Sequence, residues 1–314
     1  MSNILHPRLL ALEQLFAPAP LVRIVDAELK AAQIELWIKR DDLLHPVISG
    51  NKWRKLKYIL NHALWLGADS IVSMGGAYSN HLHALAFTGK ALGLKTAAFV
   101  RGEPPATLNP TLRDLHDWGM VVRFVSRDEY RRLRDFKAHD SLPGLAPGQY
   151  WLPEGGATEL ALRGVADTVA EIDIDFDLLA VACGTGATLA GLIASGPASS
   201  RILGVSALKN AGFLIYDVQQ LLKSQNISRE NWQIALDYHC GGFAKTTPDL
   251  LKFIRQFRAR HDIPLEPVYT GKMMFAVYDL IKQGYLKPGQ RVILLHTGGL
   301  QGNREPLEQR RRTK

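Results

Sequence analysis

The sequence of 314 residues predicts an α/β fold with two domains, each built on a parallel twisted sheet flanked by helices. Short apolar runs typical of strands alternate along the chain with segments of helical periodicity. Glycine-rich loops follow the carboxyl ends of several of these runs. Because parallel sheets bind ligands outside the carboxyl ends of their strands, we expect these loops to meet at one crevice.

The predicted elements follow one another in regular order. Strands are expected at residues 35–39, 70–74, 96–100, 121–125, 150–152, 177–182, 201–205 and 291–296. Helices are expected at residues 51–66, 79–92, 109–118, 158–172, 187–195, 213–225, 250–261 and 273–283.

The polar stretch at residues 127–149 contains two prolines and two glycines and is the predicted crossing between domains. We therefore expect a large domain from residues 1–47 plus 150–314, and a small domain from residues 48–149.

Composition places the chain among ordinary globular proteins, with 46% apolar and 22% charged residues. The formal charge is +8, of which the tail at residues 304–314 supplies +3 from five basic and two acidic residues. We expect this tail to be a frayed, solvated end. No aromatic-interleaved basic stripe, zinc-ligand spacing or basic heptad accompanies the charge, so no nucleic-acid partner is expected.

The cysteines and the N-terminal sequence bear on the compartment. Cys183 and Cys240 form no C-x-x-C pair, so the spacing indicates neither a metal site nor a redox site. Two lone thiols suit a reducing compartment. The first residues lack the apolar stretch of a signal peptide, and no run reaches the length of a membrane span. We expect a cytoplasmic protein without a membrane partner or a bound metal.

Lys52 is the first candidate for chemistry. It lies in S-G-N-K-W-R-K-L at residues 49–56, where Gly50 and Asn51 permit a tight turn before a predicted helix. A cation in the first turn opposes the helix dipole, and three basic neighbours at residues 54–57 add like charge, so we expect a lowered pKa. Condensation with an aldehyde requires such a neutral amine. A solvent-facing basic turn is the alternative.

The second candidate is G-G-A-Y-S-N-H at residues 75–81, a predicted strand-to-helix turn. Ser79, Asn80 and His81 place a hydroxyl, an amide and an imidazole at a helix N-terminus. Free backbone N–H groups there favour a carboxylate or an oxyanion. Serine and asparagine are also preferred N-cap residues, so the pattern is equally typical of a plain cap.

The third candidate is A-C-G-T-G-A-T-L-A-G at residues 182–191. Its glycines free backbone N–H groups, and its threonines add hydroxyls, which together make a phosphate cradle. The segment lacks both the P-loop Gly-Lys-Ser/Thr and the G-x-G-x-x-G spacing, so a nucleotide is weakly indicated. Tight packing between a strand and a helix would explain the glycines as well.

Two further segments offer hydroxyl groups. V-Y-T-G-K at residues 268–272 contains Tyr269 and Thr270, and L-H-T-G-G at residues 295–299 contains Thr297. Each segment alone is also typical of an ordinary turn.

In order and spacing, these segments resemble the 1-aminocyclopropane-1-carboxylate (ACC) deaminase / D-cysteine desulfhydrase family of enzymes that depend on pyridoxal 5'-phosphate (PLP). The matching pieces are I-K-R-D-D-L at residues 38–43, G-N-K-W-R-K-L, Y-S-N-H, C-G-T-G-A-T-L-A-G, P-V-Y-T-G-K and H-T-G-G. The resemblance implies the tryptophan synthase β-like architecture of PLP fold type II, with PLP between the two domains. It also implies a small amino-acid substrate and a homodimer.

The resemblance implies roles for individual residues. Lys52 matches the lysine that holds PLP as a Schiff base and acts in catalysis. Ser79, Asn80, His81 and Tyr269 match substrate-binding positions, and Ser79 and Tyr269 are also expected to be catalytic. The implied cofactor-binding residues are Lys52, Asn80 at the ring hydroxyl, the phosphate loop of Gly184, Thr185, Gly186, Ala187 and Thr188, Thr270 beside the pyridine nitrogen, and Thr297.

Two positions depart from the family pattern. In ACC deaminases the residue after the tyrosine looks like a glutamate, and here it is Thr270. A hydroxyl holds the pyridine proton less well than a carboxylate does, so Thr270 resembles the desulfhydrase branch. Both branches also carry an upstream tyrosine in a Y-G-x-P segment, where this chain has Phe243 in G-G-F-A-K. The hydroxyl of an acid–base or orienting group is thereby lost.

These features predict a deaminating lyase. An amino acid displaces Lys52 by transaldimination, Lys52 or a tyrosine-assisted base removes the α-proton with help from Ser79, and the β-substituent leaves. Hydrolysis then gives a 2-oxo acid and ammonia, so D-cysteine would yield pyruvate, sulfide and ammonia. The alternatives are an ACC deaminase that forms 2-oxobutyrate, a PLP-binding protein with little catalysis, and a nucleotide-binding protein that uses residues 182–191.

Overall fold

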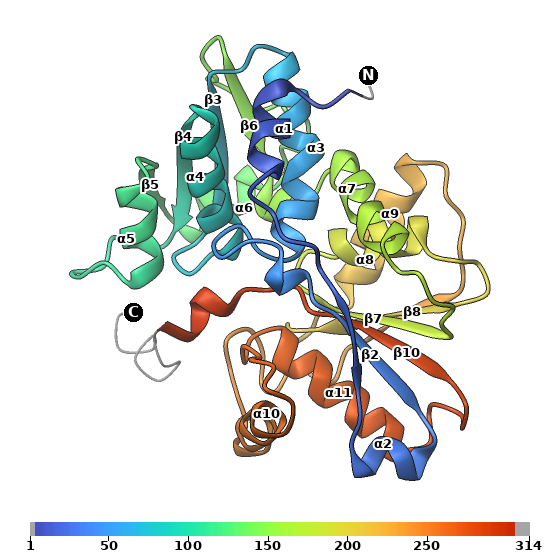
Figure 1. The fold of residues 1–314 in the computed structure, drawn as a ribbon. Coiled ribbons are helices and arrows are strands. Elements are labelled where there is room, and N and C mark those ends of the chain that lie inside the picture. The colour runs from blue at the N-terminus through green and yellow to red at the C-terminus, as the bar shows by residue number, and fades with distance from the viewer. Residues whose placement is uncertain (1–3, 305–314) are drawn as a thin grey trace.

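The computed structural model describes residues 4–304, which form two sheets (Figure 1). In spatial order, the larger sheet contains β1 (Leu21–Ile24), β2 (Glu35–Lys39), β10 (Arg291–Leu295), β7 (Leu178–Cys183), β8 (Arg201–Ser206) and β9 (Trp232–Ala235). The smaller sheet contains β5 (Val121–Val125), β4 (Lys95–Arg101), β3 (Ser70–Gly76) and β6 (Gln149–Leu152).

Strand directions confirm the predicted fold class. Neighbouring strands run parallel in both sheets, except for β1, which is antiparallel to β2. Each predicted strand is present, with its ends shifted by no more than about two residues, the usual uncertainty of such boundaries. Strands β1 and β9 were missed because each has four residues and presents a mostly half-buried surface, which gives a weak pattern.

Helices cover both faces of the larger sheet. Helices α2 (Ala27–Ala32), α10 (Pro248–His261) and α11 (Thr270–Lys282) lie on one side, and α7 (Glu159–Ala170), α8 (Ala187–Ser195) and α9 (Phe213–Ser224) lie on the other (Figure 1). The smaller body contains α1 (Pro7–Glu13), α3 (Asn51–Trp65), α4 (Asn80–Leu92), α5 (Pro110–Asp117) and α6 (Arg127–Leu133).

Some helix starts and three short helices differ from the sequence-based expectation. Helices α4, α5 and α7 each begin one residue later than predicted, α10 begins two residues earlier, and α11 begins at Thr270 rather than at residue 273. Helices α1, α2 and α6 were not predicted, since none exceeds seven residues. Helix α6 occupies part of the polar stretch at residues 127–149, where Ser126 caps it by accepting from the Glu129 backbone N–H.

Two elements join the smaller body although the predicted boundaries assign them to the large domain. Strand β6 pairs with β3, and α1 packs Leu9 and Leu12 into the core that α3 and α4 share. We therefore propose that the domain division follows the sheets, with α1 and residues 51–152 in the smaller body.

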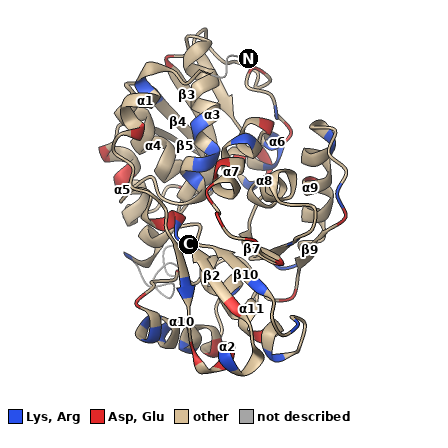
Figure 2. Cartoon of the chain, turned by 45° about the vertical axis from the view of Figure 1, so that its right-hand side comes forward, with Lys and Arg blue, Asp and Glu red and all other residues tan. Residues whose placement is uncertain are grey.

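Helices α3 and α7 are in close backbone contact at Gly164. A Cβ atom added to Gly164 would overlap the carbonyl oxygen of Arg54. Ion pairs reinforce this contact, because the Arg54 guanidinium donates to Asp41 at 3.0 and 3.1 Å and to Glu171 at 2.5 and 2.6 Å. Figure 2 places the basic residues of α3 beside α7. The two bodies are therefore joined at the helix that begins beside Lys52.

The last described residues cross back to the smaller body. The 3-10 turn Leu300–Arg304 follows the larger sheet, and the Arg304 guanidinium pairs with Asp114 of α5. Residues 305–314, which make up the rest of the predicted basic tail, lie outside the described residues. Within residues 4–304, no helix combines the length and apolarity needed to cross a bilayer.

Replacing Gly164 by alanine should lower the free energy of unfolding by about 1–3 kcal/mol, because α3 and α7 must separate to admit a methyl group. Chemical denaturation measures the change. Gly212→Ala is the matched control, since Gly212 has a φ of −54° and an added Cβ there has nothing within 4 Å. Equal stability of the two variants would contradict the close contact.

Candidate active site

Loops from both bodies meet at the turn that precedes α3. Gly50 in this turn has a φ of +65°, and an added Cβ would overlap the carbonyl oxygen of Thr297. A Cβ on Gly298 would lie 2.6 Å from Ser49 Oγ. The backbone before Lys52 therefore fits directly against the H-T-G-G loop after β10, and glycine is needed on both sides of this contact.

The side-chain amine of Lys52 is directed toward the start of α8. Its Nζ donates to Asn51 Oδ1 at 2.6 Å, and Asn51 Nδ2 donates to Thr188 Oγ1 at 2.8 Å. Burial lowers the pKa of Lys52 to about 8, although the Glu266 carboxylate opposes this shift. The amine is thus two hydrogen bonds away from the predicted phosphate loop.

The cause of the lowered pKa differs from the one inferred from sequence. Two of the basic neighbours of Lys52 are neutralised, because Arg54 pairs with Asp41 and Lys57 pairs with Glu13 at 2.8 Å. Desolvation is the main cause for Lys52, and repulsion from these two neighbours is not.

Lys55 is a buried amine that sequence analysis did not assign to the site. It lies one helical turn after Lys52, is 4% exposed, and donates to the carbonyl oxygen of Gly155. Burial and the charge of Lys52 hold the pKa of Lys55 well below its ordinary value. Among residues 4–304, no carboxylate lies within ion-pair distance of it. The i, i+3 spacing, which places both lysines on one helix face, could have revealed it.

Helix α8 presents an N-terminus suited to an anion. Its N-cap residue Gly186 has a φ of +75°, and none of the described side chains caps this end. Thr185 packs against Gly155, where a Cβ would lie 2.9 Å from Thr185 Cγ2, so the loop adjoins the segment that Lys55 contacts. The free N–H groups and the dipole of α8 favour an anion here. The amines of Lys52 and Lys55, which have no carboxylate partner among the described residues, make the place suited to a phosphate group.

Ser79, Asn80 and His81 lie at the start of α4, on the side of the smaller body. Ser79 is the N-cap and accepts from the Leu82 backbone N–H at 3.2 Å, so the cap interpretation holds for its hydroxyl. Asn80 Oδ1 accepts from Gln301 Nε2 at 2.6 Å. Asn80 Nδ2 lies 2.7 Å from the Cβ position of Gly299, which brings the amide to the H-T-G-G loop.

His81 is buried and held in one tautomer. Ser73 Oγ donates to the Leu152 carbonyl oxygen at 2.8 Å, so it accepts from His81 Nε2, which lies 2.9 Å away. Nδ1 is then the unprotonated nitrogen. Burial and the charges of Lys55 and Lys52 hold the pKa of His81 well below its ordinary value, so the ring is neutral at neutral pH.

Tyr269 lies across from these residues, against the glycine loop after β7. Its hydroxyl oxygen is 3.3 Å from the Cβ position of Gly184. Burial and the nearby carboxylates of Glu266 and Glu154 raise the pKa of Tyr269, so the hydroxyl keeps its proton at neutral pH. Phe243, which is 49% exposed, packs edge-on against this ring with centroids 6.0 Å apart.

Thr270 is completely buried in the first turn of α11. Its hydroxyl oxygen lies 3.2 Å from Glu266 Oε1 and can donate to it. Glu266 was not predicted as a site residue, because its position beside a helix N-terminus is evident only when the start of α11 at Thr270 is known.

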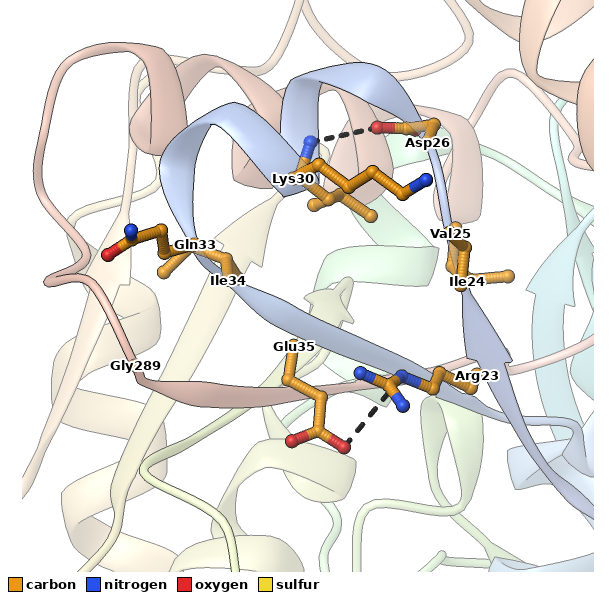
Figure 3. A pocket seen from close by; sticks show the side chains of 10 residues that line it. Arg23, Ile24, Val25, Asp26, Lys30, Gln33, Ile34, Glu35 and Gly289 are labelled. Carbon is orange, nitrogen blue, oxygen red and sulfur yellow. Dashed lines mark hydrogen bonds and ion pairs between the residues drawn. The ribbon is translucent and has the colours of Figure 1, made fainter.

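A separate cavity of about 320 Å³ lies between β1, α2 and β2 (Figure 3). Two of its carboxylates have partners: Glu35 pairs with Arg23, and Asp26 accepts from the Leu29 backbone N–H. None of the predicted site residues lines this cavity, so it is not the candidate site.

Comparisons with known proteins agree with the geometry. The family model described as pyridoxal-phosphate dependent enzyme matches residues 12–298. The chain is 30% identical over 322 residues to a protein of Pyrococcus horikoshii provisionally named 1-aminocyclopropane-1-carboxylate deaminase, covering 95% of this chain and 96% of that one. It is 29% identical to the mitochondrial bifunctional D-cysteine desulfhydrase/1-aminocyclopropane-1-carboxylate deaminase of Arabidopsis thaliana, covering 88% and 75%.

A solved structure described as an ACC deaminase homologue has a TM-score of 0.77 at 27% identity, with 95% of this chain and 96% of that chain covered. The chain therefore belongs to the pyridoxal-phosphate-dependent enzymes, and PLP is its cofactor. Within them it is a member of the ACC deaminase / D-cysteine desulfhydrase family of fold type II.

The lowered pKa of Lys52 predicts how PLP capture depends on pH. Since attack on the aldehyde needs a neutral amine, the capture rate should rise with pH to a plateau, with a midpoint of about 8 rather than the ordinary 10.5. Borohydride trapping followed by peptide mass spectrometry measures the modified fraction. Lys57, whose pKa is raised, is the internal control and should stay unmodified. Modification spread evenly over the lysines would contradict the assignment.

Proposed function

We propose that this protein is a deaminating lyase that carries out a D-cysteine desulfhydrase-like β-elimination on a small amino acid. The observation that carries the proposal is the amine of Lys52, whose pKa burial lowers to about 8, two hydrogen bonds from an uncapped helix N-terminus. PLP, when bound, supplies the electron sink that stabilises negative charge at the α-carbon of the substrate. The chain supplies binding, orientation and proton transfer.

The chain's residues fit the cofactor at several points. Lys52 would hold the aldehyde carbon, and Lys55 would gain in the phosphate the negative partner that it otherwise lacks. Asn80 would hold the ring hydroxyl, and Thr270 the ring nitrogen. Gly184, Thr185, Gly186, Ala187 and Thr188 would hold the phosphate, and Thr297 lies against Gly50 in the turn before Lys52.

The start of α4 is suited to the substrate carboxylate. Ser79, Asn80 and His81 lie at a helix N-terminus, which favours an anion. The amine of Lys52, released when the substrate takes its place, accepts the α-proton, because a pKa near 8 suits a base working at neutral pH.

Tyr269 acts in this proposal as a hydrogen-bond donor. Burial and nearby carboxylates raise its pKa, so the phenol keeps its proton at neutral pH and is not available as the tyrosine-assisted base inferred from sequence. The phenol can hold the departing thiolate by a hydrogen bond, and the thiolate takes its proton from water. Phe243, which packs against Tyr269, has no hydroxyl group, so Tyr269 is the hydrogen-bond donor of this pair.

ACC ring opening is the second candidate. The names of relatives include this activity, and the carboxylate of Glu266 behind Thr270 favours it, since a stronger electron sink helps to break a carbon–carbon bond. The homodimer implied by the resemblance stays a prediction for analytical ultracentrifugation.

A panel of D- and L-amino acids and ACC should identify the substrate. D-cysteine is expected to give sulfide, pyruvate and ammonia, and Lys52→Ala should abolish both this turnover and the visible absorption of bound PLP. Formation of 2-oxobutyrate from ACC alone would establish the second candidate. Bound PLP without turnover of any panel member would show a binding protein with little catalysis. Visible absorption that survives in Lys52→Ala would refute the role of Lys52.

Tyr269→Phe should retain PLP and lower kcat by about 10²- to 10³-fold, the usual loss when one hydrogen-bond donor to a developing anion is removed. Steady-state kinetics with the best panel substrate measures the loss. Tyr238→Phe is the control, because that hydroxyl donates to Asp279 at 2.8 Å on a different part of α11. An unchanged kcat in Tyr269→Phe would remove Tyr269 from the mechanism.

A further inference from the structure

The N-termini of helices α8 and α11 differ in electrostatic character. Helix α8 begins without a cap from the described side chains and is open to an anion. At the start of α11, the carboxylate of Glu266 accepts from the backbone N–H groups of Val268, Tyr269 and Thr270 at 2.7, 2.7 and 2.6 Å. The donors of α11 are therefore occupied, and this helix start carries a negative charge instead of a vacant anion site.

Glu266 fits this position as an ionised carboxylate. It is 3% exposed, and both its oxygens act only as acceptors toward the backbone N–H groups. Burial raises the pKa of Glu266, while these hydrogen bonds oppose the shift. Lys52 and Lys272 lie within its electrostatic influence, as does Tyr269, yet within residues 4–304 no cation lies at ion-pair distance.

Thr270 supplies the hydroxyl next to this carboxylate. Its hydroxyl donates to Glu266 Oε1 at 3.2 Å, and its oxygen accepts from the Glu266 backbone N–H at 3.1 Å. A hydroxyl oxygen has two acceptor lone pairs, so Thr270 Oγ1 can accept one more hydrogen bond. A group that donates a proton and carries positive charge is the best complement to this pair.

We infer that Glu266 and Thr270 form one unit that keeps the ring nitrogen of PLP protonated. Thr270 Oγ1 accepts from the pyridinium N–H, and Glu266 balances its positive charge from behind. The proton comes from water when the cofactor binds. This inference rests on the proposed function and revises the expectation that Thr270 alone makes the ring a weak electron sink.

The test uses PLP labelled with ¹⁵N at the ring nitrogen, because the ¹⁵N chemical shift distinguishes a protonated from an unprotonated pyridine. In the wild-type holoenzyme we expect the protonated signal at neutral pH. Glu266→Gln keeps an oxygen for the helix N–H groups but removes the charge. Its protonation midpoint should fall by about one pH unit or more, since a cation has lost its counter-charge.

Matched variants separate this role from a structural one. Glu154→Gln removes another carboxylate that influences Tyr269, but Glu154 contacts Tyr130 and Arg134 rather than Thr270, so the ¹⁵N signal should not change. Thr270→Val should lose the protonated signal, and Thr270→Ser should keep it. If Glu266→Gln does not fold, these two variants still test whether the Thr270 hydroxyl keeps the ring nitrogen protonated.

Each remaining outcome has one meaning. An unprotonated ring nitrogen in the wild type, or equal midpoints in wild type and a folded Glu266→Gln, would overturn the inference while the proposed function stands. A loss of amino-acid affinity in Glu266→Gln without a ¹⁵N change would show that this end holds the substrate ammonium instead. Failure of the wild type to bind the labelled cofactor would overturn the proposed function itself.

Discussion

The guanidinium of Arg54 holds the two bodies of the protein together. It is 5% exposed and lies between Asp41, which follows β2, and Glu171, which ends α7. Removal of either carboxylate would leave a buried charge only partly compensated, which is strongly destabilising. The backbone carbonyl of Asp41 also accepts from the Gly50 N–H at 2.8 Å. One ion network thus fixes both the helix that carries Lys52 and the turn before it.

This network divides the basic side chains of α3 into two groups. Arg54 and Lys57 have carboxylate partners toward α7 and α1, and they stabilise the packing. Lys52 and Lys55 have only amide and carbonyl partners, and burial lowers their pKa values. Within one run of like charges, the presence of a carboxylate partner therefore separates two ion-paired side chains from two buried amines with lowered pKa values.

Sequence patterns predicted the strands of both sheets because apolar runs and following glycines are local signals. They also singled out Lys52 and the loop at residues 182–191, which the structure connects through Asn51 by two hydrogen bonds. Lys55 and Glu266 escaped prediction, since their significance depends on partners distant in sequence or on the exact start of α11. The assignment of α1 and β6 to the smaller body could not be predicted for the same reason. Hydrophobic periodicity predicts an element but not the strand or helix that it pairs with or packs against.

The segment after β10 also affects how the smaller body can move relative to the larger sheet. Gln301 donates to Asn80, and Arg304 pairs with Asp114, so the end of the described chain is tied to α4 and α5. Any swing of the smaller body away from the larger sheet must break these links. The same movement would separate the Asn80 amide from the H-T-G-G loop. This short segment therefore restrains how far the two bodies can separate.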